Sequence, residues 1–441
     1  MTEGPAELFA VIGNPILHSK SPQMHNAAIR EAKIQANYIR LAAESPEEAL
    51  ETAKSAGITG MNVTSPFKNI IDHVDEVDPV AQKIKAANTV VITPEKTTGY
   101  NTDAHGVANS IIAKGVEIKG KKVVVLGAGG ASRAAIVAML EQEADVTVAN
   151  RTVEKAKELA QEFGIRYSSL DPSKLEKALD GCSIIIGCLS TGERIVPKNL
   201  LRREMTIFDA YYSSQSHLVK DGEELGCAIV DAEDWLVYQG LLAFELFTGK
   251  KAPEKIMRDA VQNAGVEQGQ GNISLVGFMG SGKDTIAKEI ASVSGQVIFD
   301  IDREIEKLAG KPIREIFETD GEEGFRSLES RVLSGIKNQK NIIVNCGGGV
   351  IMRGENRKLL KENSLVVWLW ASPSTVLKRV PRDGTRPLLE VDNPKQVIEK
   401  LLEARKCHYA EVSDMMINTD GKSPKEISER IIYEINKTFK N

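Results

Sequence analysis

Two glycine-rich turns in this sequence combine the residue types that bind phosphate groups. The first reads KKVVVLGAGGASR over residues 121–133, an apolar strand followed by a turn and a helix start. Its third fingerprint position, normally a glycine, is Ser132. The turn fits a dinucleotide site, and also an ordinary strand–helix connection. The small residues that would let a pyrophosphate approach the backbone and the free N–H groups of the helix are Gly127, Ala128, Gly129, Gly130 and Ala131.

The end of the next predicted strand favours NADP as the dinucleotide. Enzymes that use NAD usually place an acidic residue about 20 positions after the glycines, where it binds the ribose 2′-hydroxyl. Here the residues are Asn150, Arg151 and Thr152. A guanidinium and a hydroxyl suit a 2′-phosphate, and no carboxylate is present to repel it. The alternative is that Arg151 is an ordinary surface arginine.

The second turn reads NISLVGFMGSGKDT over residues 272–285, an apolar strand that leads into the pattern GxxxxGK. In a P-loop, backbone N–H groups surround the phosphates and the lysine binds the terminal phosphate oxygens. The residue after the lysine is normally a serine or threonine that binds magnesium. Asp284 stands there instead and, as a hard oxygen ligand, is a candidate Mg²⁺ ligand. We predict an ATP site at Gly280, Ser281, Gly282, Lys283, Asp284 and Thr285.

Residues 13–26, GNPILHSKSPQMHN, are dense in turn formers, hydroxyls and imidazoles. Ser19 and Ser21 precede a predicted helix, where hydroxyls and free N–H groups can bind a carboxylate. The alternative is that both serines only cap the helix. Further along, Lys68 and Asp103 form a candidate catalytic pair. A lysine beside a carboxylate in a cleft can be held in place and tuned to exchange protons with a reacting oxygen.

The composition is that of an ordinary globular chain with more than one domain. The 441 residues correspond to about three domains of ~150 residues. The net charge is only −5, so we expect no global basic field for nucleic acid or an anionic membrane. The cysteines number five and form no C-x-x-C pair, which argues against disulfides or a zinc site and favours a reducing cytoplasm. We expect neither a signal peptide nor a membrane helix.

The elements that must position these residues alternate between strand and helix. Segments with helical apolar spacing, such as 133–142 and 153–163, separate the apolar runs, which is typical of a parallel α/β fold. Residues 265–271, GVEQGQG, have the composition of a flexible linker, and a new strand begins directly after them. The short apolar runs predicted as strands are 9–12, 122–126, 145–149, 183–187, 206–208, 273–276, 341–344 and 365–369.

Several motifs in the N-terminal part together resemble the shikimate dehydrogenase family. In chain order they are HSKSPQMHN (18–26), NVTSPFK (62–68), ANT (87–89), NTD (101–103), GAGGA (127–131), NRT (150–152) and LVYQ (236–239), within a match to about residues 6–264. The resemblance implies NADPH-dependent, reversible reduction of 3-dehydroshikimate to shikimate, with Lys68 and Asp103 as the catalytic pair. It assigns Tyr212 to the NADP site as well. The residues that it assigns to the substrate are Ser19, Ser21, Thr64, Lys68, Asn88, Asp103 and Gln239.

Three departures from the family pattern cluster on the nicotinamide side of this site. The turn GCLSTG (187–192) keeps only Ser190 and Gly192 of the family's N-A-T-S-x-G. Asp234 and Trp235 replace a Gly-Met pair, which adds bulk and negative charge where backbone would approach the nicotinamide. Tyr212 lacks the proline of the family's Tyr-x-Pro element. The substrate half of the site is intact, so it is predicted more firmly than the cofactor geometry.

The C-terminal part, about residues 272–437, resembles the shikimate kinase family. Beyond the P-loop it carries FDID (299–302), GEEGFR (321–326), GGG (347–349), RPLL (386–389) and an arginine four residues before a tyrosine (405–409). The resemblance implies transfer of the γ-phosphoryl group of ATP to the 3-hydroxyl of shikimate, with Lys283 and Arg386 closing on the phosphates and Arg379 on the adenine. Asp300 would join Asp284 near magnesium. Its shikimate-binding residues would be Asp302, which also orients or deprotonates the attacking hydroxyl, Arg326, Gly348, Gly349 and Arg405.

We therefore predict a bifunctional, cytoplasmic enzyme of the shikimate pathway that uses NADP(H), ATP and Mg²⁺ on small-molecule substrates, without nucleic acid or membrane partners. The predicted fold is an N-terminal α/β substrate domain (1–105), a Rossmann domain (106–240), helices that pack back on the first domain (241–264), the linker (265–271) and a P-loop parallel-sheet kinase domain (272–441). Two alternatives remain open: a quinate/shikimate dehydrogenase fused to the kinase, or one half acting only as a weak binding module.

Overall fold

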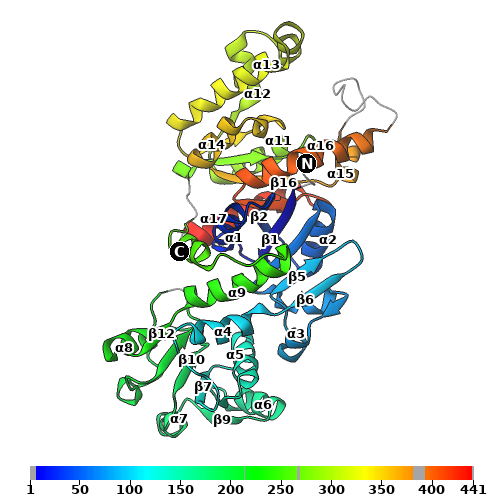
Figure 1. Cartoon of the computed structure of the whole chain (residues 1–441). Coiled ribbons are helices and arrows are strands. Elements are labelled where there is room, and N and C mark those ends of the chain that lie inside the picture. Colours follow the sequence, from blue (N-terminus) through cyan, green and yellow to red (C-terminus); the bar gives the residue numbers. More distant parts are fainter. Residues whose placement is uncertain (1–5, 213, 266–268, 381–392, 440–441) are drawn as a thin grey trace. The chain divides into compact units, whose positions relative to one another are not determined.

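The structure is a computed structural model that describes residues 6–212, 214–265, 269–380 and 393–439 (Figure 1). Its contacts divide the chain into two units. The first unit contains Met1–Pro22, Lys33–Phe67 and Ala264–Asn441. The second unit contains Gln23–Ala32 and Lys68–Asn263. The N-terminal strands therefore belong to the same unit as the C-terminal part of the chain.

The first unit is built on a parallel sheet that joins strands from both ends of the chain. The strand order is β14-β15-β13-β16-β17-β2-β1-β3. Strand β2 pairs with β1 on one side and with β17 on the other, through Met416 opposite Leu41 and Ile417 opposite Ala42. The strands are β1 (Glu7–Gly13), β2 (Ala36–Ala42), β3 (Ile58–Val63), β13 (Ile273–Val276), β14 (Val297–Asp300), β15 (Ile342–Asn345), β16 (Leu365–Trp370) and β17 (Met415–Asn418).

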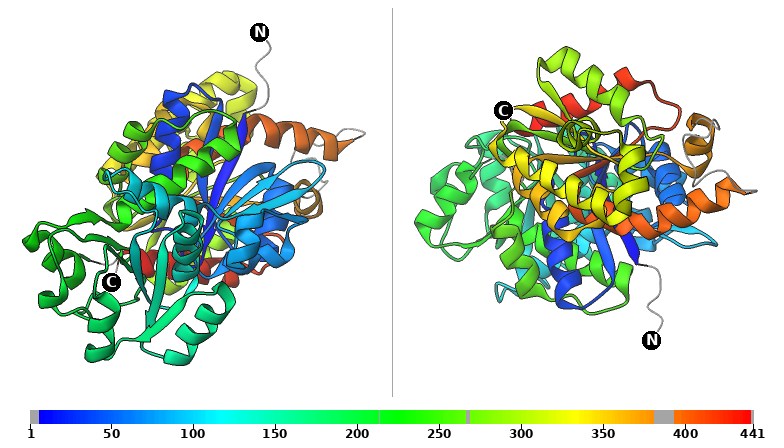
Figure 2. Two further views of the ribbon diagram at one scale, coloured as in Figure 1. Left: turned by 60° about the horizontal axis from the view of Figure 1, so that its bottom comes forward. Right: turned by 90° about the horizontal axis from the view of Figure 1, so that it is seen from above.

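Helices cover this sheet on both faces (Figures 1 and 2). Helix α13 bends at Gly321, whose φ of 70° lies in the left-handed region that glycine tolerates best. The helices are α2 (Pro46–Ala56), α11 (Lys283–Ser294), α12 (Ile301–Ala309), α13 (Ile313–Ser334), α14 (Gly354–Asn363), α15 (Pro373–Arg379), α16 (Pro394–Val412) and α17 (Pro424–Phe439), with 3₁₀ turns η3 (Gly269–Gly271), η4 (Gly335–Asn338) and η5 (Val350–Met352).

Gly269–Gly271, at the end of the predicted linker, makes hydrogen bonds within the first unit. Turn η3 contains Gln270, whose carbonyl accepts a hydrogen bond from the Asn341 N–H at 3.2 Å. The Gln270 side chain donates to the Lys337 carbonyl at 3.4 Å. Residues 266–268 lie outside the described residues. The described part of the segment is thus structured where it enters β13.

The second unit contains a parallel sheet with the order β12-β11-β10-β7-β8-β9. Strand β7 (Lys122–Leu126) lies between β10 and β8, so the turn that follows it opens at the carboxyl edge of the sheet, where α/β proteins bind ligands. A smaller set pairs β5 (Thr89–Ile92) antiparallel with β6 (Thr97–Tyr100), and β6 with β4 (Glu76–Val77). The other strands are β8 (Asp145–Asn150), β9 (Arg166–Ser169), β10 (Ile184–Gly187), β11 (Thr206–Asp209) and β12 (Ala228–Val230).

Helices connect these strands and bury their apolar side chains. The β7 run of valines is fully buried, as expected for a parallel sheet covered on both faces. Helix α1 (Ser21–Glu31) and the 3₁₀ turn η1 (Phe67–His73) each contribute residues to both units. The other elements are α3 (Pro79–Ile84), α4 (Thr102–Ile112), α5 (Gly130–Glu141), α6 (Val153–Phe163), α7 (Pro172–Leu179), α8 (His217–Leu225), α9 (Ala232–Thr248), α10 (Glu254–Gln262) and the 3₁₀ turn η2 (Lys198–Leu200).

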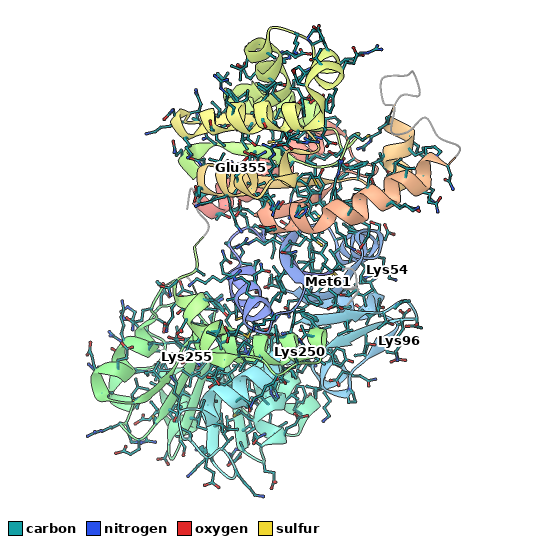
Figure 3. All side chains as sticks on the ribbon, turned by 45° about the horizontal axis from the view of Figure 1, so that its top comes forward. Lys54, Met61, Lys96, Lys250, Lys255 and Glu355 are labelled. Carbon is teal, nitrogen blue, oxygen red and sulfur yellow. The ribbon has the colours of Figure 1, made fainter. Side chains whose placement is uncertain are left out.

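The prediction of an α/β fold with parallel sheets is confirmed. Every strand predicted from an apolar run is present within one residue at each end, except that β1 is longer than the predicted 9–12 at its start. Charged side chains such as Lys54, Lys96, Lys255 and Glu355 are exposed, whereas Met61 on β3 is fully buried (Figure 3). Among the described residues, no helix is both long enough and apolar enough to cross a membrane.

Candidate functional site

The predicted catalytic pair is formed in the second unit. Lys68 lies at the start of η1, and its Nζ is 2.5 Å from Oδ2 of Asp103. Asp103 lies in the first turn of α4, where the Asn101 side chain caps the helix by accepting from the Asp103 N–H at 3.1 Å. The free N–H groups and dipole of a helix start favour a carboxylate at this position. Asp103 is 9% exposed and Lys68 27% exposed at the side chain, so the pair is shielded and still reachable from solvent.

Asn88 and Gln239, both assigned to the substrate, meet beside this pair. The Asn88 amide donates to Oγ1 of Thr102 at 2.9 Å and to Oε1 of Gln239 at 3.4 Å. The Thr102 N–H donates to Oδ1 of Asn88 at 2.7 Å. Thr102 is fully buried and was not predicted as a site residue, although it is the middle residue of the NTD motif. These hydrogen bonds fix the two amides relative to the start of α4.

Trp235 and Gly106 explain how α9 comes so close to α4. The Trp235 Nε1–H donates to the backbone carbonyl of Asp103 at 3.1 Å. A Cβ atom on Gly106 would lie 2.9 Å from both Cβ and N of Gln239. A larger residue at 106 would therefore push α9 away. Trp235, which we expected only as a disturbance of the nicotinamide side, holds the backbone of Asp103, the predicted catalytic aspartate.

Asp234 does not present an unpaired negative charge. Its carboxylate lies 2.9 Å from Nζ of Lys114 and 2.5 Å from NH1 of Arg258. Burial alone would raise the Asp234 pKa, but the hydrogen bonds and charges of these two cations outweigh it, and the pKa is lowered. The negative charge that the sequence places at this position is thus neutralised by ion pairs with Lys114 and Arg258.

Ser19, Ser21 and Thr64 lie in the first unit, at the carboxyl ends of β1 and β3. The Ser19 hydroxyl accepts from the N–H of Ser21, the first residue of α1, at 3.3 Å. Ser21 is 6% exposed. A Cβ on Gly13 would lie 2.6 Å from the Thr64 side chain, so glycine is needed where the β1 and β3 ends approach each other. The remaining substrate residues, Lys68, Asn88, Asp103 and Gln239, lie in the second unit.

The first glycine-rich turn has the geometry of a dinucleotide site. Gly127 has a φ of 113°, and a Cβ there would lie 2.6 Å from the Cys188 carbonyl oxygen. Around Gly129 and Gly130 a Cβ would meet nothing within 4 Å, so backbone N–H groups at the start of α5 are open to a ligand. Ser132 replaces the third glycine, and its buried hydroxyl accepts from the Gly129 N–H at 3.3 Å. The turn therefore fits a pyrophosphate.

The residues predicted for the 2′-phosphate lie together between β8 and α6. The Asn150 amide donates to the Thr152 carbonyl at 3.0 Å and so closes this turn. Arg151 and Thr152 are exposed, and α6 begins at the following residue. An exposed guanidinium at a helix start is available to a phosphate. Tyr212, 57% exposed, follows β11.

The second glycine-rich turn is a P-loop between β13 and α11. Gly277 has a φ of 153°, and a Cβ there would lie 2.5 Å from the Leu369 carbonyl oxygen. Lys283 Nζ donates to the carbonyls of Gly277 and Phe278 at 2.9 and 3.1 Å, across the loop it closes. The buried Ser281 hydroxyl has no hydrogen-bond partner among the described residues. The loop thus has the shape and the donors that a polyphosphate requires.

Asp284 and Asp300 are brought together by a residue that the motifs did not indicate. The Asn345 amide nitrogen donates to Oδ1 of Asp284 at 2.7 Å and to Oδ2 of Asp300 at 2.8 Å. Asn345 ends β15, two residues before the first glycine of the GGG motif, and that position was its only sequence signal. Carboxylate oxygens are ligands that Mg²⁺ prefers, and the Asn345 amide nitrogen holds these two carboxylates close together. The predicted metal residues therefore fit a magnesium ion.

Asp284 and Asn345 line a cavity of about 400 Å³ in the first unit. Arg379 lines it and is held by Thr419, with NH2 donating to the Thr419 carbonyl at 2.6 Å. Arg386 lies outside the described residues. Predicted residues on the cavity wall are Gly280, Gly282, Lys283, Asp284, Thr285, Asp302, Gly348 and Arg379.

Arg326 and Gly349 are packed against each other next to this cavity. A Cβ on Gly349 would lie 2.3 Å from the Arg326 guanidinium, which leaves no room for a larger residue. Arg326 NH1 donates to Oε2 of Glu329 at 2.9 Å. Burial raises the pKa of Glu329, and the charge and hydrogen bond of Arg326 oppose that shift. Glu329 is a site residue that the motifs did not identify.

Arg405 and Gly348 are positioned by aromatic residues. The Arg405 guanidinium stacks over the Phe278 ring at 5.6 Å from its centre. The Tyr409 hydroxyl donates to the Gly348 carbonyl at 2.6 Å. This hydrogen bond fixes the orientation of the Gly348 carbonyl. The tyrosine four residues after Arg405 therefore holds the GGG turn through a hydrogen bond.

Comparisons with known proteins assign the two glycine-rich turns to two different families. Three family models match the N-terminal part of the chain. They are described as "Shikimate dehydrogenase substrate binding domain" (residues 11–90), "Shikimate / quinate 5-dehydrogenase" (107–210) and "Shikimate 5'-dehydrogenase C-terminal domain" (236–262). The model of shikimate kinase matches residues 279–436. Both resemblances inferred from the motifs are therefore confirmed.

Individual proteins agree with the N-terminal match. A shikimate dehydrogenase (NADP(+)) of Pyrococcus abyssi is 36% identical over 258 residues, which cover 57% of this chain and 96% of that protein. The crystal structure of shikimate dehydrogenase from Aquifex aeolicus has a TM-score of 0.55 at 35% identity and covers 60% of this chain and all of that one. The Thermus thermophilus enzyme in complex with NADP(H) and shikimate has a TM-score of 0.53 at 32% identity, over 58% of this chain and 98% of that chain.

Proposed function

The chain belongs to the shikimate dehydrogenase family and also carries a shikimate kinase domain, and we propose that it catalyses two consecutive reactions. It reduces 3-dehydroshikimate to shikimate with NADPH and then phosphorylates shikimate with ATP. The observation that carries this proposal is that one chain contains both family matches, with the dehydrogenase models over residues 11–90, 107–210 and 236–262 and the kinase model over 279–436. The C3 hydroxyl produced by the first reaction is the nucleophile of the second.

We propose the domain limits 1–105 for the substrate domain, 106–240 for the Rossmann domain, 241–264 for the returning helices, 265–271 for the linker and 272–441 for the kinase. These limits describe the functional parts of the chain. The two units described above divide it differently, because β1–β3 share a sheet with the kinase strands. The functional domains and the structural units therefore overlap.

In the dehydrogenase, the serine hydroxyls of Ser19 and Ser21 bind the substrate carboxylate at the start of α1. The ring hydroxyls contact Thr64, Asn88 and Gln239. NADPH supplies the hydride when it is bound. Lys68 donates the proton to the carbonyl oxygen as the alkoxide develops, and Asp103 holds the ammonium group in position. In the reverse direction the same lysine accepts that proton.

The cofactor site of the dehydrogenase combines the glycine turn with the arginine that follows β8. Backbone N–H groups at the start of α5 bind the pyrophosphate, and Ser132 keeps the turn closed. Arg151 binds the 2′-phosphate, with Asn150 and Thr152 beside it. Tyr212 lies on the nicotinamide side of the site.

In the kinase, phosphoryl transfer depends mainly on positioning and charge neutralisation. Arg326 and Arg405 bind the shikimate carboxylate, and the N–H groups of Gly348 and Gly349 complete that side. Asp302 orients the 3-hydroxyl and accepts its proton. The groups that would neutralise the phosphates are Lys283 and Arg386, with Arg379 at the adenine. Asp284 and Asp300 would hold Mg²⁺, which would supply further positive charge to the phosphates.

A coupled assay on the full chain tests the proposal. With 3-dehydroshikimate, NADPH and Mg·ATP, we expect NADPH oxidation followed by ADP formation, and no ADP formation when NADPH is left out. Shikimate added directly should restore ADP formation without NADPH. A chain that oxidises NADPH but never forms ADP would remove the kinase assignment. Parallel assays with NADH and with quinate test the quinate/shikimate alternative, which predicts turnover of quinate at a rate similar to that of shikimate.

A further inference from the structure

The backbone turn that carries Ser19 and Ser21 is held by side chains from the far end of the chain. Residues 13–21 connect β1 to α1, and helix α17 of the kinase segment belongs to the same unit. Both Ile16 and Leu17 in this turn are fully buried. The partners of their backbone groups therefore decide whether the turn keeps its shape.

Glu434 on α17 provides those partners. Its Oε2 accepts hydrogen bonds from the N–H groups of Ile16 at 2.8 Å and Leu17 at 2.9 Å. The Glu434 side chain is fully buried, and its other oxygen accepts from NH2 of Arg430 at 2.7 Å. A buried carboxylate is costly unless it is paired and hydrogen-bonded, so this residue is held where it is by all three donors.

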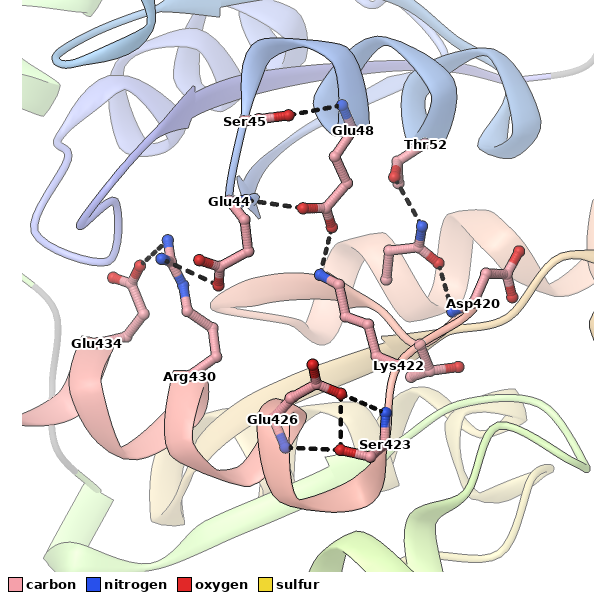
Figure 4. A network of polar contacts seen from close by, with 12 residues as sticks. Glu44, Ser45, Glu48, Thr52, Asp420, Lys422, Ser423, Glu426, Arg430 and Glu434 are labelled. Carbon is pink, nitrogen blue, oxygen red and sulfur yellow. Dashed lines mark hydrogen bonds and ion pairs between the residues drawn. The ribbon is translucent and has the colours of Figure 1, made fainter.

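Arginines attach the same turn at its two ends. Arg430 NH2 donates to the Gly13 carbonyl at 3.5 Å, and NH1 pairs with Glu44 at 3.4 Å (Figure 4). At the other end, Arg40 on β2 donates to the Ser19 carbonyl from Nε at 3.0 Å and from NH2 at 2.6 Å. Arg40 NH1 donates to the Asp414 carbonyl at 3.0 Å, next to β17.

The surrounding contacts make this attachment rigid. β17 pairs with β2, and the Asn418 amide donates to Thr52 on α2 at 2.9 Å. Lys422, at the start of the segment that leads to α17, pairs with Glu48 on α2 (Figure 4). The chain that leads into α17 is thus held against β2 and α2, and this fixes α17 next to the turn.

We propose that Glu434 is a positioning residue of the dehydrogenase reaction, through which the kinase segment sets the geometry of the substrate turn. This inference rests on the proposed function. Most of α17 lies within the kinase match over residues 279–436, and the dehydrogenase family models match residues 11–262 in three segments. In this chain, a helix of the kinase segment therefore supplies the hydrogen-bond acceptor for a turn of the dehydrogenase segment. Ser19 lies two residues beyond Leu17, so a shift of the turn displaces the serine directly.

The test compares Glu434→Gln, Glu434→Ala and Glu429→Ala in the full chain. Glu429 is exposed on the same helix and serves as the matched control. Glutamine keeps the size of the side chain and one oxygen acceptor, so this variant remains informative if the alanine variant fails to fold. For Glu434→Gln we expect the dehydrogenase KM for shikimate to rise about tenfold, with kcat, the KM for NADP and the kinase KM for shikimate within about twofold of wild type.

Three outcomes are decisive. An unchanged dehydrogenase KM for shikimate in a folded Glu434→Gln variant overturns the inference. A parallel change in all four constants also overturns it, because that result indicates general destabilisation. Amide hydrogen exchange at Ile16 and Leu17 should accelerate at least about tenfold in Glu434→Gln. This readout does not require turnover, so a wild-type chain without dehydrogenase activity would reject the proposed function while the contact itself is still tested.

Discussion

The Nζ atom of Lys68 lies 2.5 Å from Oδ2 of Asp103, and the backbone carbonyl of that aspartate accepts a hydrogen bond from Trp235. The pair is therefore fixed from two sides, by the capped start of α4 and by α9. A lysine held in this way has one orientation in which to exchange a proton with a substrate oxygen. The arrangement connects the NTD motif with a residue 132 positions later.

Replacing Lys68 by alanine removes the proposed proton donor and does not change the dinucleotide turn. We expect kcat for 3-dehydroshikimate reduction to fall by about 10³-fold, within the usual range for a general acid. NADPH binding, followed by fluorescence, should stay near the wild-type value. Lys83→Ala is the control, because Lys83 is an exposed lysine of the same unit that pairs with Glu141. Loss of NADPH binding in Lys68→Ala would point to misfolding and not to lost chemistry.

Replacing Arg151 by alanine should weaken the preference for NADP. The guanidinium is exposed at the start of α6, where a 2′-phosphate would bind. We expect the KM for NADPH to rise about tenfold and the KM for NADH to change little. Steady-state kinetics with both cofactors measure this. Arg166→Ala, an exposed arginine on β9 that pairs with Asp145, should leave both constants unchanged. Equal effects on NADPH and NADH would contradict the assigned role.

Replacing Asp284 by serine restores the residue type that usually follows the P-loop lysine. We expect kinase activity to be retained within about threefold, or to rise, because a hydroxyl binds magnesium and places less negative charge beside the phosphates. The measurement is ADP formation from shikimate over a range of Mg²⁺ concentrations. Asp300→Asn, in the same cluster around Asn345, should in contrast lower activity. A loss above about tenfold in Asp284→Ser would give Asp284 a specific role of its own.

Replacing Asp234 by asparagine leaves Lys114 and Arg258 without their shared carboxylate. We expect the free energy of unfolding at pH 7 to fall by about 2 kcal/mol. The folded-state pKa of Asp234 is lowered below its unfolded value of about 3.9, so the ion pairs stabilise the protein above about pH 4. That contribution is lost as the pH falls through the folded-state pKa, and the difference between variant and wild type should then shrink.

Urea unfolding at pH 7 and near pH 3 measures this dependence. Glu143→Gln removes an exposed carboxylate that pairs with Lys119, with both side chains about two-thirds exposed, and such pairs contribute little. It should have a small effect at both values of pH. A difference between Asp234→Asn and wild type that grows toward low pH would contradict the ion-pair account.

Local features of the sequence determined much of this protein. Positions 127 and 277 require glycine because their φ is positive and a Cβ would overlap backbone at the end of a neighbouring strand. Both turns can therefore be recognised from a short stretch of sequence. The apolar runs are visible for a similar reason, since strands buried on both faces are continuously apolar. With the motif order, these features were sufficient for the α/β fold, both families and the Lys68–Asp103 pair.

Only the tertiary structure decided which distant residues support the sites. Asn345 joins Asp284 to Asp300, Trp235 holds the backbone of Asp103, and Glu434 holds the turn at Ile16 and Leu17. Each of these contacts depends on how strands and helices order themselves in a sheet, and pairing between elements hundreds of positions apart leaves no spacing pattern in the chain. The pairing of β2 with β17 is such a case. Strands pair through backbone hydrogen bonds, which form with any side chains, so the sequence does not show which strands become neighbours.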